Sequence, residues 1–582
     1  MHQQVGQYDL STVVNKDTFS ETVEFRQCEI EGRSLVTKQP LNPGDIILVE
    51  HPQLRYLIEP ECRSSLSPHY SKRLWQQLKE SIQNDEDFSP GVPAAMLGYL
   101  SLKEEERPKY DFFYYPELTE EHPTVQLIKE ASNTVVSTVP EFKDIDAMDM
   151  AKFILKIYGN AHTVSFAHER TTQTHKKRKE RRQRYIPKFG EPYDNSAFAE
   201  ERQVQQRSMI CLMTWGSKFA HSCAPNMFLQ YEPSENVMVF RAVRALEQGT
   251  VLSFSYLPED DMSLGGLVCG TTVLRQAKLR KFKFFECACT RCSDYDWSRG
   301  CEGEIYYHKG QWETRCGVQQ DIPSFIGKRE DHVQKITLAF AGLAHGLKPV
   351  DEDSLRMIEP YMEDLLHPEE EEEDDDDEDK EVPVPEHHWT YGSIHAVLST
   401  YHLKLFSQFF GKGLAERFGM TQKGLNEAVI YMRFLNNRIW SCPSGSPGNP
   451  MAAFFAGWRI LTIVMESVFQ GTQKTVAIRS TKTETIPGNN SNNKKKKCND
   501  DDSDSSDDDS SSEEEEELVT TTELIPMPEI WKQPVGQIID IVQSEWIPLV
   551  TQVFHARRSP VVDDMLQRIN QFIDRVEQVS AL

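Results

Sequence analysis

Three cysteines lie within six residues of this chain, at Cys287, Cys289 and Cys292. At this spacing three thiolates can face one metal ion, but tetrahedral zinc needs a fourth ligand. The remote Cys223 is the best candidate, because it precedes a run of predicted strands whose hairpins can return the chain to the cluster. Buried reduced thiols are the alternative, although Thr290 and Arg291 between the cysteines make a core position difficult. The expected zinc ligands are Cys223, Cys287, Cys289 and Cys292.

The remaining cysteine usage favours a reducing compartment. Twelve cysteines in 582 residues are too few and too clustered for a disulfide-dense secreted scaffold. The first residues show no basic start followed by an apolar stretch, so no secretory signal is visible. The most apolar segment, 451–469, contains Arg459 and Glu466, which favours a buried helix of a soluble protein over a membrane span. We therefore expect no membrane association.

The acidic character of the chain is concentrated in two runs. Of the net charge of −26, residues 369–381 carry −11 and residues 494–517 carry −8. Both runs are typical of solvated, disordered segments, so the folded part is close to charge-balanced. A chain of 582 residues predicts about three or four folded units. A basic block at 176–184 is either a solvated segment or one that serves nuclear import or binds a polyanion.

Alternating and β-branched residues predict strands in two separate regions. The first lies within 23–57, where Pro40 to Gly44 supply a turn, and the second within 226–256. Between them, apolar residues at helical spacing predict a helical segment. Segments 393–410, 425–440 and 452–469 show the same periodicity, which predicts a helical C-terminal half. A short hairpin is expected at 303–312, and a metal site formed by Cys301, Cys316 and His308 is a weak alternative.

Five segments in a fixed order resemble one protein family. They are Gly32-Arg33-Ser34-Leu35, Tyr158-Gly159-Asn160-Ala161-His162-Thr163-Val164, His221-Ser222-Cys223-Ala224-Pro225-Asn226, Ser255-Tyr256, and Phe285-Glu286-Cys287-Ala288-Cys289-Thr290-Arg291-Cys292. Together they resemble the SET domain and post-SET zinc knuckle of protein-lysine methyltransferases. The likeness is greatest to the SET and MYND subfamily. The resemblance implies an α+β fold: a β-rich SET core, a helical insert, a zinc-bound post-SET knuckle and an α-helical C-terminal domain.

The resemblance also implies roles for individual residues. Tyr256 would line the channel for the substrate lysine and act in catalysis. The cofactor, S-adenosyl-L-methionine, would contact the residues that match the family's cofactor segments. These residues are Gly32, Arg33, Leu35, Asn160 and His221. Methyl transfer needs a neutral amine, whereas free lysine has a pKa of ~10.4, so the site must favour deprotonation by burial and hold the reactants in line.

Three departures from the family pattern stand out. Ala220 replaces an asparagine expected to contact the cofactor, and Lys283 replaces a second channel tyrosine. A cation at that position would repel the entering lysine unless its side chain points outward. The MYND finger is absent, because Cys62 is the one cysteine between Glu50 and Asn160. The helical insert takes its place.

These inferences define the expected organisation and function. The expected domain boundaries are SET N-terminal part 23–57, helical insert 58–147, SET C-terminal part 148–258 with a basic loop at 171–207, post-SET zinc region 259–316, helical C-terminal domain 317–480 with an acidic run at 369–381, disordered acidic linker 481–517, and C-terminal helices 518–582. We expect a methyltransferase that uses S-adenosyl-L-methionine and acts on lysine of histone or non-histone proteins. The rival readings are a catalytically weak SET scaffold and a chromatin-associated adaptor that binds proteins.

Further expectations concern partners and location. The expected partner is a protein substrate lysine, with histones or other basic tails as candidates. Nucleic acid remains an open alternative for the basic block. We expect a monomer in the nucleus, the cytoplasm or both.

Overall fold

The computed structural model describes most of the folded part of the chain. The described residues are 3–4, 8–28, 32–82, 88, 90–118, 121–168, 205–257, 272–293, 306–308, 311–313, 332, 335–336, 339, 351–368, 383–384, 386, 389–405, 414–440, 450–480 and 517–582. Several expectations fall outside these residues. They concern the basic block at 176–184, Cys301, Cys316, the acidic run at 369–381 and the linker at 481–516.

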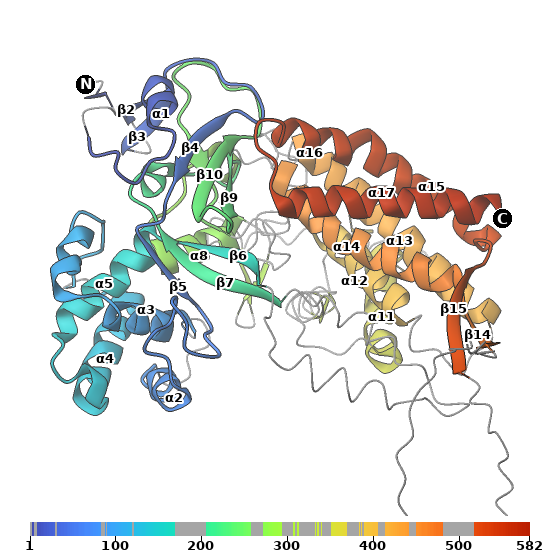
Figure 1. Cartoon of the computed structure of the whole chain (residues 1–582), viewed down its shortest axis with the longest axis horizontal. Coiled ribbons are helices and arrows are strands. Elements are labelled where there is room, and N and C mark those ends of the chain that lie inside the picture. The colour runs from blue at the N-terminus through green and yellow to red at the C-terminus, as the bar shows by residue number, and fades with distance from the viewer. Residues whose placement is uncertain are drawn as a thin grey trace, which may run out of the picture.

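Small sheets built from two distant parts of the sequence form the middle of the molecule (Figure 1). The strands are β1 (Gln3–Gln4), β2 (Val23–Cys28), β3 (Gly32–Thr37), β4 (Ile46–Glu50), β5 (Leu54–Leu57), β6 (His162–His168), β7 (Gln205–Leu212), β8 (Ala220–His221), β9 (Met227–Glu232), β10 (Val237–Ala242) and β11 (Ser253–Phe254). Their order is β1-β2-β3, β4-β10-β9, β5-β7-β6 and β11-β8. Strands β4 and β5 therefore pair with strands that follow about 150 to 190 residues later.

The predicted strands are found, but strands β6 and β7 were not anticipated. β7 begins at Gln205, so the expected polar loop at 171–207 is wrong for its last three residues. In β6 and β7, His162 pairs with Cys211 and Val164 with Met209. Strands β8 and β11 are two residues long and parallel, with Phe254 opposite His221. This short pairing places His221 close to Tyr256.

A helical unit occupies one end of the molecule (Figure 1). Its helices are α2 (Lys72–Glu80), α3 (Gly91–Leu100), a 3₁₀ helix at Glu104–Tyr110, α4 (Pro123–Thr138), a 3₁₀ turn at Pro140–Phe142 and α5 (Ala147–Asn160). Side-chain caps explain two of the starts: Ser71 accepts from Leu74 N before α2, and Asp146 accepts from two backbone N–H groups before α5. Helix α3 is buried along nearly its whole length, so this unit has its own core.

The other end is formed by long helices and one ribbon. The elements are α11 (Glu352–Leu366), α12 (Trp389–Leu405), α13 (Leu414–Trp440), α14 (Pro450–Gly471), β14 (Gln473–Ser480), β15 (Glu517–Leu524), α15 (Glu529–Ile541), a π-helical turn at Val542–Trp546, α16 (Ile547–Val553) and α17 (Pro560–Ala581). Strands β14 and β15 pair antiparallel, from Gln473 opposite Leu524 to Ser480 opposite Glu517. We expected a helical domain up to residue 480 and a disordered linker from 481 to 517. Instead, residues 473–480 and 517–524 form the two strands of this ribbon.

Among the described residues, helix α14 is the one helix that is both long and apolar enough to cross a membrane. By length and composition it could cross a membrane, and 61% of its most apolar window is buried in the structure. Its glycines lie against tryptophans, Gly457 against Trp546 and Gly471 against Trp531. The helix is thus packed within the C-terminal helical core.

An arginine joins this helical end to the central sheets. Arg241 on β10 is fully buried, and its Nη1 donates to the carbonyls of Val553 at 3.2 Å and Arg557 at 2.9 Å. Its guanidinium carbon lies 4.4 Å from the ring centroid of Phe554, and Phe228 stacks on Phe455 at 5.6 Å. The last elements of the chain therefore pack directly on the core strands.

Three further helices and one hairpin complete the description. Helix α1 spans Lys16–Thr22, helix α8 spans Thr272–Lys283 and helix α9 spans Thr290–Ser293. The expected hairpin is present as β12 (Tyr306–His308) paired with β13 (Gln311–Glu313).

Candidate functional site

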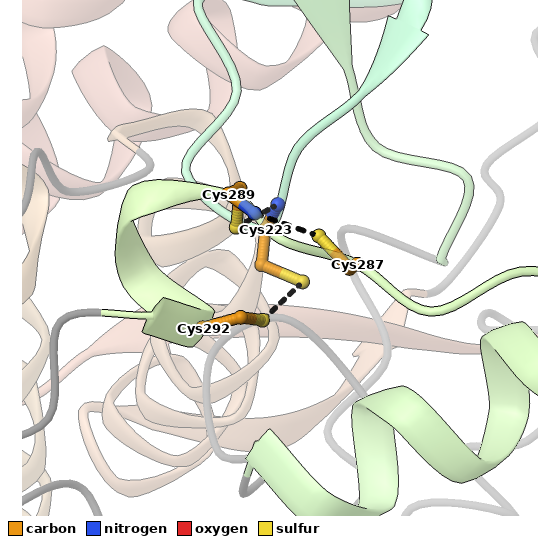
Figure 2. A group of neighbouring side chains, drawn as sticks. All are labelled: Cys223, Cys287, Cys289 and Cys292. Carbon is orange, nitrogen blue, oxygen red and sulfur yellow. Dashed lines mark hydrogen bonds between the residues drawn. The ribbon is translucent and has the colours of Figure 1, made fainter. Parts of the chain in front are cut away.

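Four cysteines from two distant segments meet at one point (Figure 2). Cys223 follows β8, Cys287 and Cys289 follow α8, and Cys292 lies on α9. Their sulfur atoms all lie within 4.8 Å of one another, and Sγ of Cys223 is 3.6 Å from Sγ of Cys292. The fold thus brings together the four residues that the sequence singled out.

Local hydrogen bonds fix the cysteine backbone. The amide side chain of Gln276 on α8 donates to the Cys287 carbonyl at 2.5 Å and accepts from its N–H at 2.7 Å. Helix α8 ends because Phe284 adopts a left-handed φ of 64°, a conformation that turns the chain out of a helix. The chain then enters the cysteine segment, where Cys292 N–H donates to the Cys289 carbonyl.

The residues around the cluster fit a zinc ion. Zinc with sulfurs at ~2.3 Å requires sulfur–sulfur distances of about 3.8 Å, close to the 3.6 Å between Cys223 and Cys292. Two buried guanidinium groups lie beside the thiols: Arg275 Nη2 is 3.8 Å from Cys292 Sγ, and Arg291 Nη1 donates to the Cys223 carbonyl at 3.2 Å. A divalent ion with four thiolates carries two net negative charges, which these cations would balance.

The four thiols differ in how readily they lose a proton. The pKa of Cys223 and that of Cys287 are raised, whereas hydrogen bonds from the neighbouring thiols, that of Cys223 foremost, lower the pKa of Cys289 and of Cys292. The backbone N–H of Cys223 also points at Cys289 Sγ, at 3.4 Å. Because the thiolate is the metal ligand, both contacts favour binding of a cation at this cluster.

His221 connects the cysteine cluster to Tyr256. Its Nδ1 accepts from the Tyr256 N–H at 3.0 Å, so the proton of the neutral ring is on Nε2, which lies 3.4 Å from Cys223 Sγ. Burial lowers the pKa of His221 to about 3, which keeps the ring neutral. The resemblance predicted contact with adenine, but both nitrogens already face partners within the protein.

Tyr256 is held at both of its polar groups. Its hydroxyl donates to the Phe219 carbonyl at 2.6 Å, and burial raises the pKa of its phenol. The ring lies 5.1 Å from that of His221, 5.2 Å from Phe254 and 6.1 Å from Phe285. Tyr256 remains partly exposed, so an ordered aromatic side chain retains access to solvent.

Lys283 points toward Tyr256 rather than outward. Its Nζ donates to the Ala161 carbonyl at 2.8 Å and lies 5.5 Å from the Tyr256 ring centroid. Burial lowers the pKa of this amine to about 7. The sequence predicted that a cation here would repel an entering lysine unless its side chain pointed outward, and the side chain does not point outward.

His162 is a member of this site that the sequence reasoning gave no role. It is 7% exposed, and its ring lies 4.6 Å from Phe254 and 5.4 Å from Tyr256. Its Nε2 has no hydrogen-bond partner among the described residues. Burial, and then the charge of Lys283, hold the pKa of His162 well below its usual value. Its position two residues after Asn160 was the available signal.

Comparison with known proteins identifies the core. A family model described as the SET domain matches residues 32–257. We call residues 32–257 the SET domain because they match this family model. No curated protein matches the chain. The crystal structure of the SET domain of LSMT bound to lysine and AdoHcy is 9% identical, with a TM-score of 0.23, over 78% of this chain and 89% of that chain.

The SET domain contains Cys223, His221 and Tyr256, whereas the other three cysteines follow it in sequence. Since Cys223 contacts Cys292 and Cys289, the cysteine cluster attaches the following segment to the SET domain. His221 links this attachment to Tyr256, because its Nε2 lies 3.4 Å from Cys223 Sγ and its Nδ1 accepts from the Tyr256 N–H.

The predicted cofactor residues of the SET domain are less closely gathered. Asn160 is buried, and its Nδ2 donates to the carbonyls of Tyr114 at 2.7 Å and Lys156 at 2.8 Å. The Leu35 side chain is fully buried in the core, and its carbonyl accepts from Leu252 N–H at 2.9 Å. A cofactor would therefore have to contact Asn160 at its side-chain oxygen. The Leu35 side chain has no exposed surface through which a cofactor could reach it.

Gly32 and Arg33 begin strand β3 of the SET domain. They pair with Cys28 and Gln27 of β2, and the side chain at 33 lies outside the described residues. The strand runs antiparallel to residues 250–252, since Thr37 N–H donates to the Thr250 carbonyl and Leu252 N–H to that of Leu35. The first residues of β3 thus lie at the end of the strand that is nearer to β11. Their predicted cofactor contacts remain predictions.

Proposed function

We propose that this protein transfers a methyl group from S-adenosyl-L-methionine to a lysine ε-amine of another protein. The observation that carries the proposal is the SET domain at residues 32–257, which ends beside a tyrosine held at its hydroxyl and its backbone N–H. The cofactor would supply an activated methyl group on sulfur. The chain's own residues would bind and orient the acceptor amine, and burial among them would favour its neutral form.

The site supplies the environment that such an acceptor needs. A nucleophilic lysine must be neutral, and burial is the physical means of lowering an ammonium pKa. The chain demonstrates this on its own lysine, because burial lowers the pKa of Lys283 to about 7 beside Tyr256. The carbonyls of Ala161 and Phe219, which accept from Lys283 and Tyr256, are acceptors suited to orient an amine. Alignment and electrostatics would then supply the rate enhancement.

The test is label transfer with a tyrosine variant. Purified protein and labelled S-adenosyl-L-methionine are incubated with a whole-cell extract, and the labelled proteins are identified. We expect Tyr256→Phe to reduce label transfer at least tenfold, which corresponds to ~1.4 kcal/mol of barrier, because the hydroxyl that fixes the ring is lost. Tyr391→Phe, in the C-terminal helix α12, is the matched control. Equal transfer by wild type and Tyr256→Phe would remove the role assigned to Tyr256.

Lys283 favours one rival function, a catalytically weak SET scaffold. Its amine lies beside Tyr256, where a cation would oppose an entering lysine ammonium by like-charge repulsion. Ala220 adds the loss of an expected polar contact. Calorimetric titration with S-adenosyl-L-methionine distinguishes the readings, because a scaffold without cofactor binding would give no heat of binding while an enzyme would.

We also propose zinc at the four cysteines, and membership of the SET and MYND subfamily with helices α2–α4 in place of its finger. Cys62 as the one cysteine between residues 50 and 160 supports that replacement. Histones or other basic tails are proposed substrates because of the acidic runs. We propose that the protein lies in the nucleus, the cytoplasm or both, because the basic block at 176–184 is typical of a nuclear-import segment.

A further inference from the structure

The amine of Lys283 has the surroundings that a substrate amine would need. It donates to the Ala161 carbonyl at 2.8 Å, and it lies 5.5 Å from the centroid of the Tyr256 ring. A carbonyl acceptor and an aromatic face are the two groups that attract an alkylammonium ion in a partly desolvated site. The chain therefore already holds a lysine amine at the residue to which we assign substrate lysine binding.

We propose that Lys283 is an internal occupant of the aromatic cluster around Tyr256, and that a substrate lysine must displace it in order to bind. The cluster comprises Tyr256, His162, His221, Phe254, Phe285 and Lys283. This inference rests on the proposed function, because it takes Tyr256 as the substrate-binding tyrosine. It makes Lys283 a determinant of affinity for cationic side chains.

The rings of the cluster favour one ammonium and disfavour two. His162, His221 and Phe254 lie 5.4, 5.1 and 5.2 Å from Tyr256, so the Tyr256 ring packs against three other aromatic rings. No carboxylate among the described residues forms an ion pair with Lys283. A second ammonium entering this cluster would meet uncompensated positive charge, and at a few ångströms that repulsion is strong in a low-dielectric site.

His162 is a third polar group with a part in the displacement of Lys283 by a substrate lysine. His162 Nε2 is buried and has no partner among the described residues. An unpaired buried nitrogen costs free energy, so this atom is an available partner for an amine that is displaced from Ala161 or that enters the cluster. The geometry thus offers two polar partners for amines near the Tyr256 ring, the Ala161 carbonyl and His162 Nε2.

The charge of Lys283 is sensitive to pH near neutrality. The titratable groups that face it are His162 from β6, His221 from β8 and Tyr256 after β11. Burial lowers the pKa of His162 and brings that of His221 to about 3, and it raises the pKa of Tyr256, so none of these three changes charge between pH 6 and pH 8.5. Lys283, with a pKa of about 7, does.

The direction of the effect follows from competition. Below pH 7 Lys283 is mostly an ammonium ion that occupies the cluster around Tyr256. Above pH 7 it is mostly neutral and is no longer attracted to the Tyr256 ring. An external lysine side chain has a pKa of ~10.4 and stays cationic throughout. If only the neutral form admits ligand, the apparent Kd is divided by the neutral fraction. At pH 6 that fraction is about one tenth, so binding is about tenfold weaker than at pH 8.5.

The experiment measures binding of N-α-acetyl-lysine amide by NMR at pH 6 and pH 8.5, without cofactor. Wild type should bind about tenfold more weakly at pH 6. Lys283→Met, which removes the charge at similar length, should bind equally at both pH values and as tightly as wild type at pH 8.5. Lys283→Arg, which stays charged, should bind weakly at both. Lys281→Met is the matched control, because Lys281 lies on the same helix over Phe88, and it should behave as wild type.

Three results would overturn the proposal. They are equal binding by wild type at the two pH values, the same pH dependence in Lys283→Met as in wild type, and tight binding by Lys283→Arg at pH 6. The wild-type comparison needs no variant, so it stands even if a substitution impairs folding. Label transfer without pH-dependent binding would contradict this proposal alone, whereas pH-dependent binding without label transfer would contradict the proposed methyl transfer alone.

Discussion

At the residue scale, the site depends on four cysteines and on the direction of the Lys283 side chain. A zinc ion bound by Cys287, Cys289 and Cys292 would need a fourth ligand, and the sulfur of Cys223, which the sequence had predicted for this role, lies within 4.8 Å of the other three. Lys283, by contrast, is the last residue of α8. Whether it points to solvent or to Ala161 depends on the left-handed turn at Phe284 and on contacts with β6, which no local pattern contains.

Replacement of Lys283 should also change stability in a pH-dependent way. Its pKa falls from ~10.4 in the unfolded chain to about 7 in the folded protein. Between these values the unfolded chain binds more protons, so stability rises with pH. Lys283→Met should therefore stabilise the protein by about 1–3 kcal/mol at pH 7, and the gain should shrink toward pH 10. Urea unfolding at both pH values measures it; a gain that grows with pH would contradict the assignment.

His221 should act through stability more than through metal binding. Its Nδ1 accepts the Tyr256 N–H in a buried site, and an orphaned buried N–H costs ~1–3 kcal/mol. His221→Ala should lower the free energy of unfolding by that amount and retain zinc, since the four thiols remain. Chemical denaturation with metal analysis checks both. Loss of zinc together with unchanged stability would show that His221 serves the metal instead.

At the element scale, elements with a clear local pattern were predictable and short or non-local pairings were not. Alternation predicted β9 and β10, and helical spacing predicted α12 to α14. Strands β14 and β15 pair Gln473 with Leu524 across a linker of low-complexity sequence. The partner of either strand therefore cannot be inferred from the sequence around it. Strand β8 has two residues, too few to show a period of two, whereas β11 lies within the predicted strand region 226–256. Their pairing nevertheless positions His221.

Loss of one cysteine should release the segment after the SET domain. Cys289→Ser should reduce zinc from about one equivalent to less than half, because three thiols and a hydroxyl hold zinc poorly. Amide exchange should then increase across α8 and α9, which the cluster ties to Cys223. Cys62→Ser, at an exposed cysteine, is the control and should retain zinc. Full zinc content in Cys289→Ser would refute the four-thiolate site.

At the scale of the whole molecule, the C-terminal helices are attached to the SET domain by buried polar and aromatic contacts. The two buried hydrogen bonds from Arg241 to Val553 and Arg557 join residues more than three hundred positions apart. The sequence predicted both parts but not this contact, because an isolated arginine on a strand reads as a solvent-exposed side chain. Only the arrival of the last helices buries it.

Removal of this arginine should weaken the attachment. Arg241→Met leaves two buried carbonyls without a donor and should destabilise the protein by about 3 kcal/mol. Calorimetry should show the C-terminal helices unfolding at a lower temperature than the SET domain. Arg558→Met, at a half-exposed arginine paired with Asp563, should leave the profile unchanged. A single unshifted transition in Arg241→Met would argue that the aromatic contacts suffice.

The sheet order β4-β10-β9 has a consequence during synthesis on the ribosome. Val49 pairs with Val239, so the apolar strand β4 leaves the ribosome about 190 residues before its partner. At ~5–20 residues per second it waits roughly 10 to 40 seconds, and Arg241 waits longer still for the final helices. The nascent chain therefore exposes the apolar, unpaired strand β4 while about a third of the chain is synthesised, which makes it a natural client for chaperones that shield such intermediates.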